Sequence, residues 1–383
     1  MYELVASRLE MPRSGIRQIH ELAERLPDVV RLHIGEPSVT TPRHIIDAAF
    51  RAAQTGHTHY TPNAGLLSLR QLIAERMRQK CGNTPSTNQI VVTTGAVTAI
   101  ASVLLAVADI GDEILIPDPG WPNYESMILS QAAIPKRYRL NKANGFQPDV
   151  DEMESLIGER TRAIIVNSPA NPTGAVFHRK TMEQIVALAE SHGLYIISDE
   201  VYDEIVFNGE HVSPFQYGSP AVVSVYSFSK TYAMTGWRVG YAVGPEPLMA
   251  LVTKLQEPLV SCASSVSQKA AEAALSGPQD FVAEMRRTYL ERRDSALRLL
   301  DECNIPHVQP NGTFYLMIDL QDVAEGDPSQ LAIRLLEEYR VAVAPGTTFG
   351  ETSRYMVRLS LAARTEDILE GIRRIDRFRR KDQ

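Results

Sequence analysis

Short, almost wholly apolar runs alternate with longer helical segments through the middle of this 383-residue chain. Runs that are apolar at nearly every position indicate strands buried on both faces, as in parallel sheets covered by helices. The segments between them, such as 96–108 and 181–192, have the pattern of crossover helices. We therefore predict an α/β fold with a mostly parallel seven-stranded sheet sandwiched by helices. The predicted strands are 89–94, 113–117, 133–138, 162–167, 194–198, 221–227 and 239–243.

The last part of the predicted sheet follows a different pattern. Its last two strands are joined by only 11 residues, 228–238. Because a parallel crossover needs about a dozen residues or more, the final strand can instead pair antiparallel. Beyond residue 248 the pattern is helical, and we expect long helices at 249–277 and 278–304.

The C-terminal tail mixes both kinds of element, which indicates a smaller α+β domain. A chain of 383 residues, 44% of them apolar, is larger than one core usually holds. We predict a large domain at 44–280 and a small domain built from both termini, 1–43 and 281–383. Periodicity assigns no element to the first 40 or so residues. In the tail we expect strands at 313–319, 341–345 and 355–360, and helices at 329–339 and 365–380.

The overall composition excludes several classes of partner. The chain has 46 acidic and 39 basic residues, a net charge of −7 and no basic cluster, which argues against nucleic acid. Its three cysteines, Cys81, Cys262 and Cys303, lack the spacing of a metal site. The N-terminus has no long apolar run, and no segment approaches the roughly 20 apolar residues that span a membrane. We expect a cytoplasmic protein without metal or membrane.

The most informative stretch is SFSKTYAMTGWRVG, residues 227–240. Lys230 follows a buried strand and so lies at the carboxyl edge of the sheet, where α/β enzymes bind ligands. Loss of water there lowers the pKa of a lysine and frees its amine for Schiff-base chemistry. Ser227, Ser229 and Arg238 offer hydroxyls and a planar guanidinium to a phosphate. Taken alone, a lysine such as Lys230 is more often an ordinary solvated residue of a surface loop.

Three further loops follow predicted strands in the same way. Asp199 in SDEVYDEIVF is a carboxylate that needs a cationic partner, such as a pyridinium nitrogen, although it also suits a helix N-cap. Tyr202 lies three residues later and can reach a phenolic oxygen. The loop NSPANPTG presents Asn171. In TTGAVTAI, Gly95 precedes a helix whose first backbone N–H groups can hold a phosphate.

These loops together bring a phosphate cradle, an amide, a carboxylate and a lysine to one edge of the sheet. The chain contains neither GxGxxG nor GxxxxGK[ST], so dinucleotide and nucleoside-triphosphate sites have no support.

At this point the chain resembles the fold-type I pyridoxal 5'-phosphate (PLP) enzymes, and among them the class I aminotransferases of the aspartate and aromatic group. The resemblance runs from about residue 14 to 364, and its motifs stand in family order. They are GEPSVTTP, YTPNAGLLSLR, TTGAV, PDPGWPNY, NSPANPTG, SDEVY, SFSKTYAMTGWRVG and RLSLA.

The resemblance implies that Lys230 forms the Schiff base with PLP and shuttles the proton. It implies that Asp199 pairs with the pyridine nitrogen and that Trp121 stacks on the ring. Tyr60 would reach the phosphate of a neighbouring subunit, which implies a homodimer with shared sites. The other implied cofactor contacts are Tyr202 and Asn171 on the phenolic oxygen, with Ser227, Arg238 and the backbone of Ala96 and Val97 on the phosphate.

For the substrates, the resemblance implies that Arg358 in RLSLA clamps the α-carboxylate, helped by Asn171 and the backbone of Gly35. A planar carboxylate suits a bidentate guanidinium. The implied reaction moves an amino group between an L-amino acid and a 2-oxo acid by a ping-pong mechanism. A PLP-dependent lyase, racemase or oxidative enzyme would use the same residues, because the pocket selects which bond breaks. A non-catalytic PLP-binding regulator is an alternative from another class.

The two positions that hold a distal carboxylate in acid-specific relatives differ here. Those relatives have a lysine and a threonine where this chain has Val97 and Ile16. An unpaired carboxylate is costly to bury against apolar side chains. We therefore predict a neutral, apolar or aromatic amino donor. Arg17, next to Ile16, could supply a charge to a distal carboxylate, so an acidic substrate stays an alternative. Ser264 or Ser265 of a partner subunit is a further candidate for lining the pocket.

Overall fold

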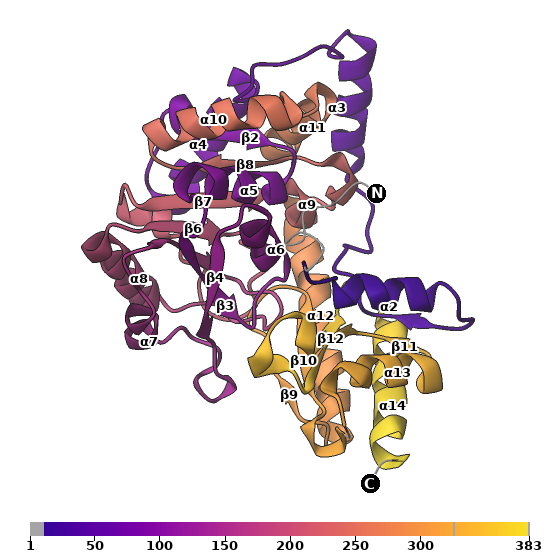
Figure 1. Ribbon diagram of the computed structural model, residues 1–383. Coiled ribbons are helices and arrows are strands. Elements are labelled where there is room, and N and C mark those ends of the chain that lie inside the picture. Colours follow the sequence, from indigo (N-terminus) through magenta and orange to yellow (C-terminus); the bar gives the residue numbers. More distant parts are fainter. Residues whose placement is uncertain (1–10, 325, 382–383) are drawn as a thin grey trace, which may run out of the picture.

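The computed structural model describes residues 11–324 and 326–381. Its main sheet has seven strands in the order β2-β8-β7-β6-β5-β3-β4 (Figure 1). All pairs are parallel except those of β8, which runs antiparallel to β2 and β7. The prediction of a mostly parallel seven-stranded sheet is confirmed. The strands are β2 (Ile90–Thr93), β3 (Glu113–Asp118), β4 (Ile134–Arg139), β5 (Thr161–Asn167), β6 (Tyr195–Asp199), β7 (Val222–Ser227) and β8 (Gly240–Val243).

Helices cover both faces of this sheet. Alternate residues of one strand enter different apolar clusters: Ile165 of β5 packs on one face, and Ile164 and Val166 pack on the other. This double burial explains the nearly continuous apolar runs in the sequence. The helices of this part are α3 (Arg43–Gln54), α4 (Leu67–Cys81), α5 (Ala96–Val107), α6 (Asn123–Ser130), α7 (Val150–Ser155), α8 (Arg179–His192), α9 (Phe228–Thr231), α10 (Glu246–Val260) and α11 (Ser265–Ser276).

The single helix predicted at 249–277 is wrong, because α10 and α11 are separate helices. Pro258, inside α10, lacks a backbone N–H and weakens the last turn. Ser261 then adopts a positive φ of 59°, which ends the helix. The Ser264 side chain accepts a hydrogen bond from the Ser267 backbone at 3.3 Å and caps the next helix.

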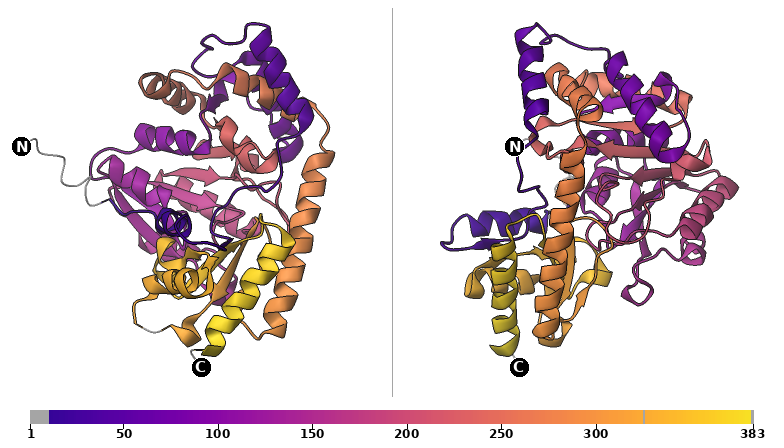
Figure 2. Two further views of the ribbon diagram at one scale, coloured as in Figure 1. Left: turned by 90° about the vertical axis from the view of Figure 1, so that its right-hand side faces the viewer. Right: turned by 180° about the vertical axis from the view of Figure 1, so that it is seen from behind.

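The C-terminal part forms a smaller, antiparallel sheet in the order β12-β13-β10-β9. The strand predicted at 341–345 is divided at Val343 into β11 and β12, which join different sheets. Figure 2 shows the long α12 running from the level of the main sheet down beside the smaller one. The elements here are α12 (Asp280–Glu302), β9 (His307–Val308), β10 (Tyr315–Asp319), α13 (Leu331–Tyr339), β11 (Val341–Ala342), β12 (Ala344–Pro345), β13 (Met356–Ser360) and α14 (Thr365–Lys381).

The N-terminal segment that the sequence left unassigned contains α2 (Gly15–Ala23) and β1 (Val30–Arg31). β1 pairs in parallel with β11, so residues near both ends of the chain share a sheet. This pairing supports the division into 44–280 and a unit of 1–43 with 281–383, which stays a proposal. In the described part of the chain, no helix is long and apolar enough to cross a membrane, and no cluster of His, Cys, Asp and Glu suits a metal ion.

Candidate functional site

A cavity of about 470 Å³ opens where the carboxyl edge of the main sheet meets α2 and the small sheet. Most of the residues singled out in the sequence line it, although they lie far apart in the chain. Four do not: Gly95, which directly precedes the lining residue Ala96, Tyr60, which is 89% exposed, and Ser264 and Ser265 at the start of α11. The predicted residues in the lining are Ile16, Gly35, Ala96, Val97, Trp121, Asn171, Asp199, Tyr202, Ser227, Ser229, Lys230, Arg238 and Arg358.

Lys230 lies on the short helix α9, directly after β7. The hydroxyl of Ser227 accepts a hydrogen bond from the Ser229 backbone at 3.1 Å and starts this helix. The Lys230 Nζ atom donates to the carbonyl of Gly35 at 2.6 Å. Burial lowers the pKa of Lys230, because the charged ammonium loses water. The lysine is thus held in the cavity by a neutral partner.

Asp199 ends β6 and is buried. Its Oδ2 accepts a hydrogen bond from the Tyr124 hydroxyl of α6 at 2.5 Å, and its Oδ1 accepts one from the Val201 backbone at 3.4 Å. Burial raises the pKa of Asp199 to about 6, and the bond from Tyr124 opposes that rise. Among the residues described, no cationic side chain forms an ion pair with Asp199. The carboxylate therefore suits a cationic ligand atom in the cavity.

Arg358 lies on β13 and is only 2% exposed. Its Nη1 donates to Oδ1 of Asn171 and its Nη2 to the His33 carbonyl, both at 2.8 Å. The Tyr315 ring centroid lies 4.0 Å from its Cζ. In the described part of the chain, none of its partners is a carboxylate. A buried guanidinium with only neutral partners is expected to attract a carboxylate from a ligand.

Gly35 is required by the close approach of Tyr315. A Cβ at position 35 would lie 1.7 Å from the Tyr315 hydroxyl oxygen. That hydroxyl in turn lies 3.0 Å from the hydroxyl of Tyr202. The absence of a side chain at Gly35 therefore lets its carbonyl meet Lys230 while Tyr315 passes behind it.

The start of α5 and Arg238 form one concave, positively polarised corner. Gly95 has a φ of +82°, and a Cβ there would lie 2.5 Å from Nη2 of Arg238. Among residues 11–324 and 326–381, the guanidinium of Arg238 bonds only to the carbonyls of Thr235 at 2.9 Å and Thr94 at 3.4 Å. The first N–H groups of a helix have no intrahelical partner. Such a corner is suited to a phosphate.

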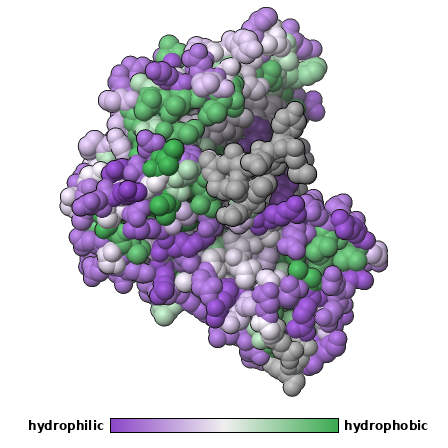
Figure 3. Space-filling view, viewed as in Figure 1, coloured by the Kyte–Doolittle hydropathy of each residue, from purple (hydrophilic) through white to green (hydrophobic). Residues whose placement is uncertain are grey.

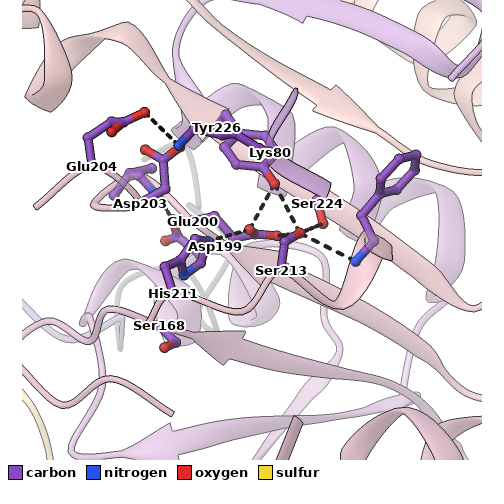
Figure 4. A network of polar contacts seen from close by, with 12 residues as sticks. Lys80, Ser168, Asp199, Glu200, Asp203, Glu204, His211, Ser213, Ser224 and Tyr226 are labelled. Atoms are coloured by element: carbon purple, nitrogen blue, oxygen red, sulfur yellow. Dashed lines mark hydrogen bonds and ion pairs between the residues drawn. The ribbon is translucent and has the colours of Figure 1, made fainter. Parts of the chain in front are cut away.

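A second group of charges lies behind Asp199 (Figure 4). Glu200 is fully buried and accepts hydrogen bonds from Tyr226 at 2.8 Å, His211 at 2.8 Å and Ser213 at 3.0 Å. Asp203 forms ion pairs with both Lys80 and Arg76 of α4. We call these residues the Glu200 cluster: Arg76, Lys80, Glu200, Asp203, His211, Ser213 and Tyr226. None of its acids faces the cavity.

Sequence reasoning missed two tyrosines of the site. Tyr124, in the motif PDPGWPNY, binds Asp199, and its ring meets that of Trp121 edge-on at 5.3 Å. Its position three residues after Trp121, at the start of a helix, was the available signal. Tyr315 lies in a strand whose apolar pattern indicated only core. Its contact with Arg358 joins residues 43 positions apart and could not be read from spacing.

Comparisons with known proteins identify the family. The protein-family model for aminotransferase class I and II matches residues 27–375 of this chain. A probable aspartate/prephenate aminotransferase of Aquifex aeolicus is 37% identical over 364 residues, which covers 93% of this chain and 92% of the relative. Aromatic-amino-acid aminotransferase 2 of Thermococcus litoralis is 34% identical, with 97% of each chain covered.

A solved structure shows the same likeness. It is the aspartate aminotransferase from Thermus thermophilus with maleate, which matches this fold with a TM-score of 0.94 at 34% identity. The match covers 98% of this chain and 100% of that one. The names of these relatives include both acidic and aromatic substrates. Membership of the family therefore does not decide which side chain the cavity accepts.

Proposed function

The chain belongs to the class I and II aminotransferases, and from this premise we propose that its amino donor is a neutral, apolar or aromatic L-amino acid, with a 2-oxo acid as acceptor. The observation that carries this proposal is the composition of the cavity wall. Arg358 supplies a buried clamp for the α-carboxylate, while Ile16, Ile34 and Val97 line the same cavity. The exposed fractions of Ile34 and Val97, 42% and 38%, leave apolar surface for a ligand to cover.

The cavity fits pyridoxal phosphate as the cofactor. Arg238 and the start of α5 would hold its phosphate, and Asp199 would hold its ring nitrogen. Trp121, Asn171 and Tyr202 line the space that remains for the ring. Each charged member of this set lacks an oppositely charged side chain among the residues described, as expected of groups that await a ligand. When bound, the cofactor supplies an electron sink that stabilises a carbanion at the substrate α-carbon.

Lys230 is the group that we propose to move the proton. Burial lowers the pKa of Lys230 and so favours the neutral amine, the form that can accept the α-proton at Nζ. The Gly35 carbonyl orients that atom at 2.6 Å. Once protonated, the same Nζ can return the proton to a neighbouring carbon, so a single residue serves as base and then as acid.

Arg358 fixes the orientation of the substrate. A carboxylate bound by its guanidinium is held in one plane, because two parallel N–H bonds define that plane. Asn171 and the His33 carbonyl occupy one donor on each Nη atom, and Tyr315 supports the flat face. In our proposal both substrates use this clamp in turn, as a ping-pong mechanism requires.

A panel of amino donors tests the proposed side-chain class. We expect kcat/KM to be highest for an aromatic or large apolar L-amino acid, because Ile16, Ile34 and Val97 lose water only against such a side chain. Aspartate or glutamate as the best donor would contradict the proposal. Release of ammonia without an acceptor would favour the lyase or oxidative alternative, and exchange of the α-proton with inversion would favour the racemase.

A homodimer is the proposed assembly. Figure 3 shows apolar side chains gathered over α10 and α5, and exposed apolar residues on these helices include Leu105, Leu251, Leu259 and Val260. Exposed apolar patches of this kind mark interaction surfaces. Tyr60 is exposed and lies outside its own cavity, which is compatible with a contact to a partner's phosphate. Sedimentation analysis of the Leu259→Glu variant tests this face, and an unchanged dimer would contradict its role.

A further inference from the structure

His20 is one of the polar residues, together with Ser14 and Arg17, that line the cavity beside Ile16. Ile16 and His20 both line the cavity and lie four residues apart on α2, so they share one face of that helix. Nδ1 of His20 lies 3.2 Å from Nε2 of His33. His33 is fully buried, and its backbone carbonyl accepts the hydrogen bond from Arg358. The histidine pair therefore connects the distal wall with the α-carboxylate clamp.

The surroundings of His33 determine where the protons of this pair lie. Burial lowers the pKa of His33 to about 4, so its ring is neutral and carries one N–H. Nδ1 of His33 is buried without a partner, and a buried N–H is costly to leave unpaired. The proton is therefore best placed on Nε2 of His33, where it is donated to Nδ1 of His20. A neutral His20 that accepts at Nδ1 must carry its own proton on Nε2.

Nε2 of His20 is free to serve a ligand. It has no hydrogen-bond partner among the residues described, and it is not one of the enclosed unpartnered atoms. An uncharged N–H donor has a useful property at this position. It forms a charge-assisted hydrogen bond with a carboxylate. When an apolar side chain occupies the pocket instead, an uncharged donor leaves no buried cation without a counter-charge.

We infer that His20, oriented by His33, is the residue that allows one pocket to accept both a neutral amino donor and a dicarboxylic 2-oxo acid. His20 binds the distal carboxylate of the acid through Nε2, while Ile16, Ile34 and Val97 contact the neutral side chain. This inference rests on the proposed function, because it takes the donor to be neutral. It assigns to His20 a role in specificity and none in the chemical step.

The test measures the acceptor half-reaction of the loaded enzyme with 2-oxoglutarate and with phenylpyruvate. In His20→Leu, kcat/KM for 2-oxoglutarate should fall about 10- to 100-fold, through KM, because one hydrogen bond to a charged group is lost. The value for phenylpyruvate should stay within about twofold. His20→Gln keeps an N–H donor and should recover part of the loss. Gln18→Leu, on the exposed side of the same helix, is the matched control.

Several outcomes would overturn the inference. They are an equal loss for both acceptors, no loss for either, or a wild-type enzyme that does not use 2-oxoglutarate. A selective loss in Arg17→Gln that His20→Leu lacks would assign the distal contact to Arg17 instead. The proposed function fails separately, through the donor panel of the wild-type enzyme. If the wild-type enzyme prefers aspartate as donor, and His20→Leu lowers kcat/KM for 2-oxoglutarate alone, the proposed function fails. His20 would then still bind the distal carboxylate of acidic substrates.

Discussion

The cavity and the Glu200 cluster are adjacent, and they treat buried charge in opposite ways. In the cavity, Lys230, Asp199 and Arg358 are bound only by neutral groups in the described structure. In the Glu200 cluster, Glu200 has three donors and Asp203 has two cationic partners. Asp199 and Glu200 are consecutive residues, yet Asp199 belongs to the cavity and Glu200 belongs to the cluster of paired charges.

The difference separates function from scaffold. A buried charge without a counter-charge costs free energy until a ligand supplies one. A buried charge with a full set of partners serves the fold, and its loss leaves those partners stranded. Substitutions in the cavity should therefore reduce activity and preserve stability, whereas substitutions in the Glu200 cluster should do the reverse.

The largest expected effect follows from removing Lys230. Lys230→Ala should lower kcat by roughly 10⁴-fold or more, because the atom that moves the proton is absent. The midpoint of thermal unfolding of the cofactor-free protein should stay the same or rise, since a desolvated amine is gone. Steady-state rates and calorimetry measure the two quantities. Retention of more than a hundredth of the activity would contradict the assignment.

The Glu200 cluster should respond in the opposite way. Asp203→Ala removes the buried acid that Arg76 and Lys80 share, and leaves both cations only Glu204, at 3.0 and 2.7 Å. We expect a loss of about 2–4 kcal/mol in the free energy of unfolding, because Glu204 compensates part of the buried positive charge. Per folded molecule, kcat should change less than twofold, because Asp203 does not line the cavity. Denaturant unfolding and titrated active sites measure these values. Glu75 is an exposed acid on α4, the helix that carries Arg76 and Lys80, and Glu75→Ala is the control for a change of surface charge.

Arg358 offers the sharpest contrast with Asp203, since both are buried ionised groups. Arg358→Leu should lower kcat/KM by an amount that corresponds to about 2–5 kcal/mol of lost transition-state stabilisation, because the carboxylate clamp is removed. Its free energy of unfolding should fall less than in Asp203→Ala, by about 1–2 kcal/mol, because only the neutral oxygens of Asn171 and His33 lose a donor. Arg358→Lys keeps the charge but not the planar fork, and should recover only a small part of the activity. A loss of stability as large as that of Asp203→Ala would remove the contrast.

Asp199 adds a pH dependence to the cofactor-free protein. Its pKa is raised to about 6 from an ordinary value of 3.8, so the folded state binds more protons between these values. Stability therefore falls as pH rises from about 4 to 6, by up to about 3 kcal/mol. Asp199→Asn should lack this component of the pH profile. Denaturant unfolding of both proteins from pH 4 to 6.5 measures the difference, and identical profiles would contradict the raised pKa.

The smallest effect concerns Tyr124, whose hydrogen bond opposes the rise in the pKa of Asp199. Tyr124→Phe should move the upper end of that pH window to a higher value. The free energy of unfolding at pH 7 should fall by about 1–2 kcal/mol, because a hydrogen bond to a charged group is lost. Tyr138→Phe is a matched control, since its hydroxyl bonds to the Ile165 carbonyl and not to an acid.

The sequence was sufficient for the main sheet and for most of the cavity. Most of the seven strands were indicated by nearly apolar runs, because strands covered on both faces leave an unbroken apolar signature; the edge strand β4 is polar at several positions. Chemistry-bearing residues directly after those strands, such as Lys230, Asp199 and Asn171, were necessarily gathered at one edge. The break at Ser261 was missed because a helical pattern continues across it, and only backbone geometry reveals the end of α10.

By itself, the sequence determined the strands of the sheet and the identity of the groups that follow them, because the carboxyl ends of parallel strands lie at one edge of a sheet. Only the tertiary structure decided how those groups are paired. It placed Tyr124 on Asp199, Tyr315 beside Arg358, and His20 on a buried His33. Such contacts depend on how helices and the two sheets pack, and packing joins residues whose separation in the chain carries no periodic signal.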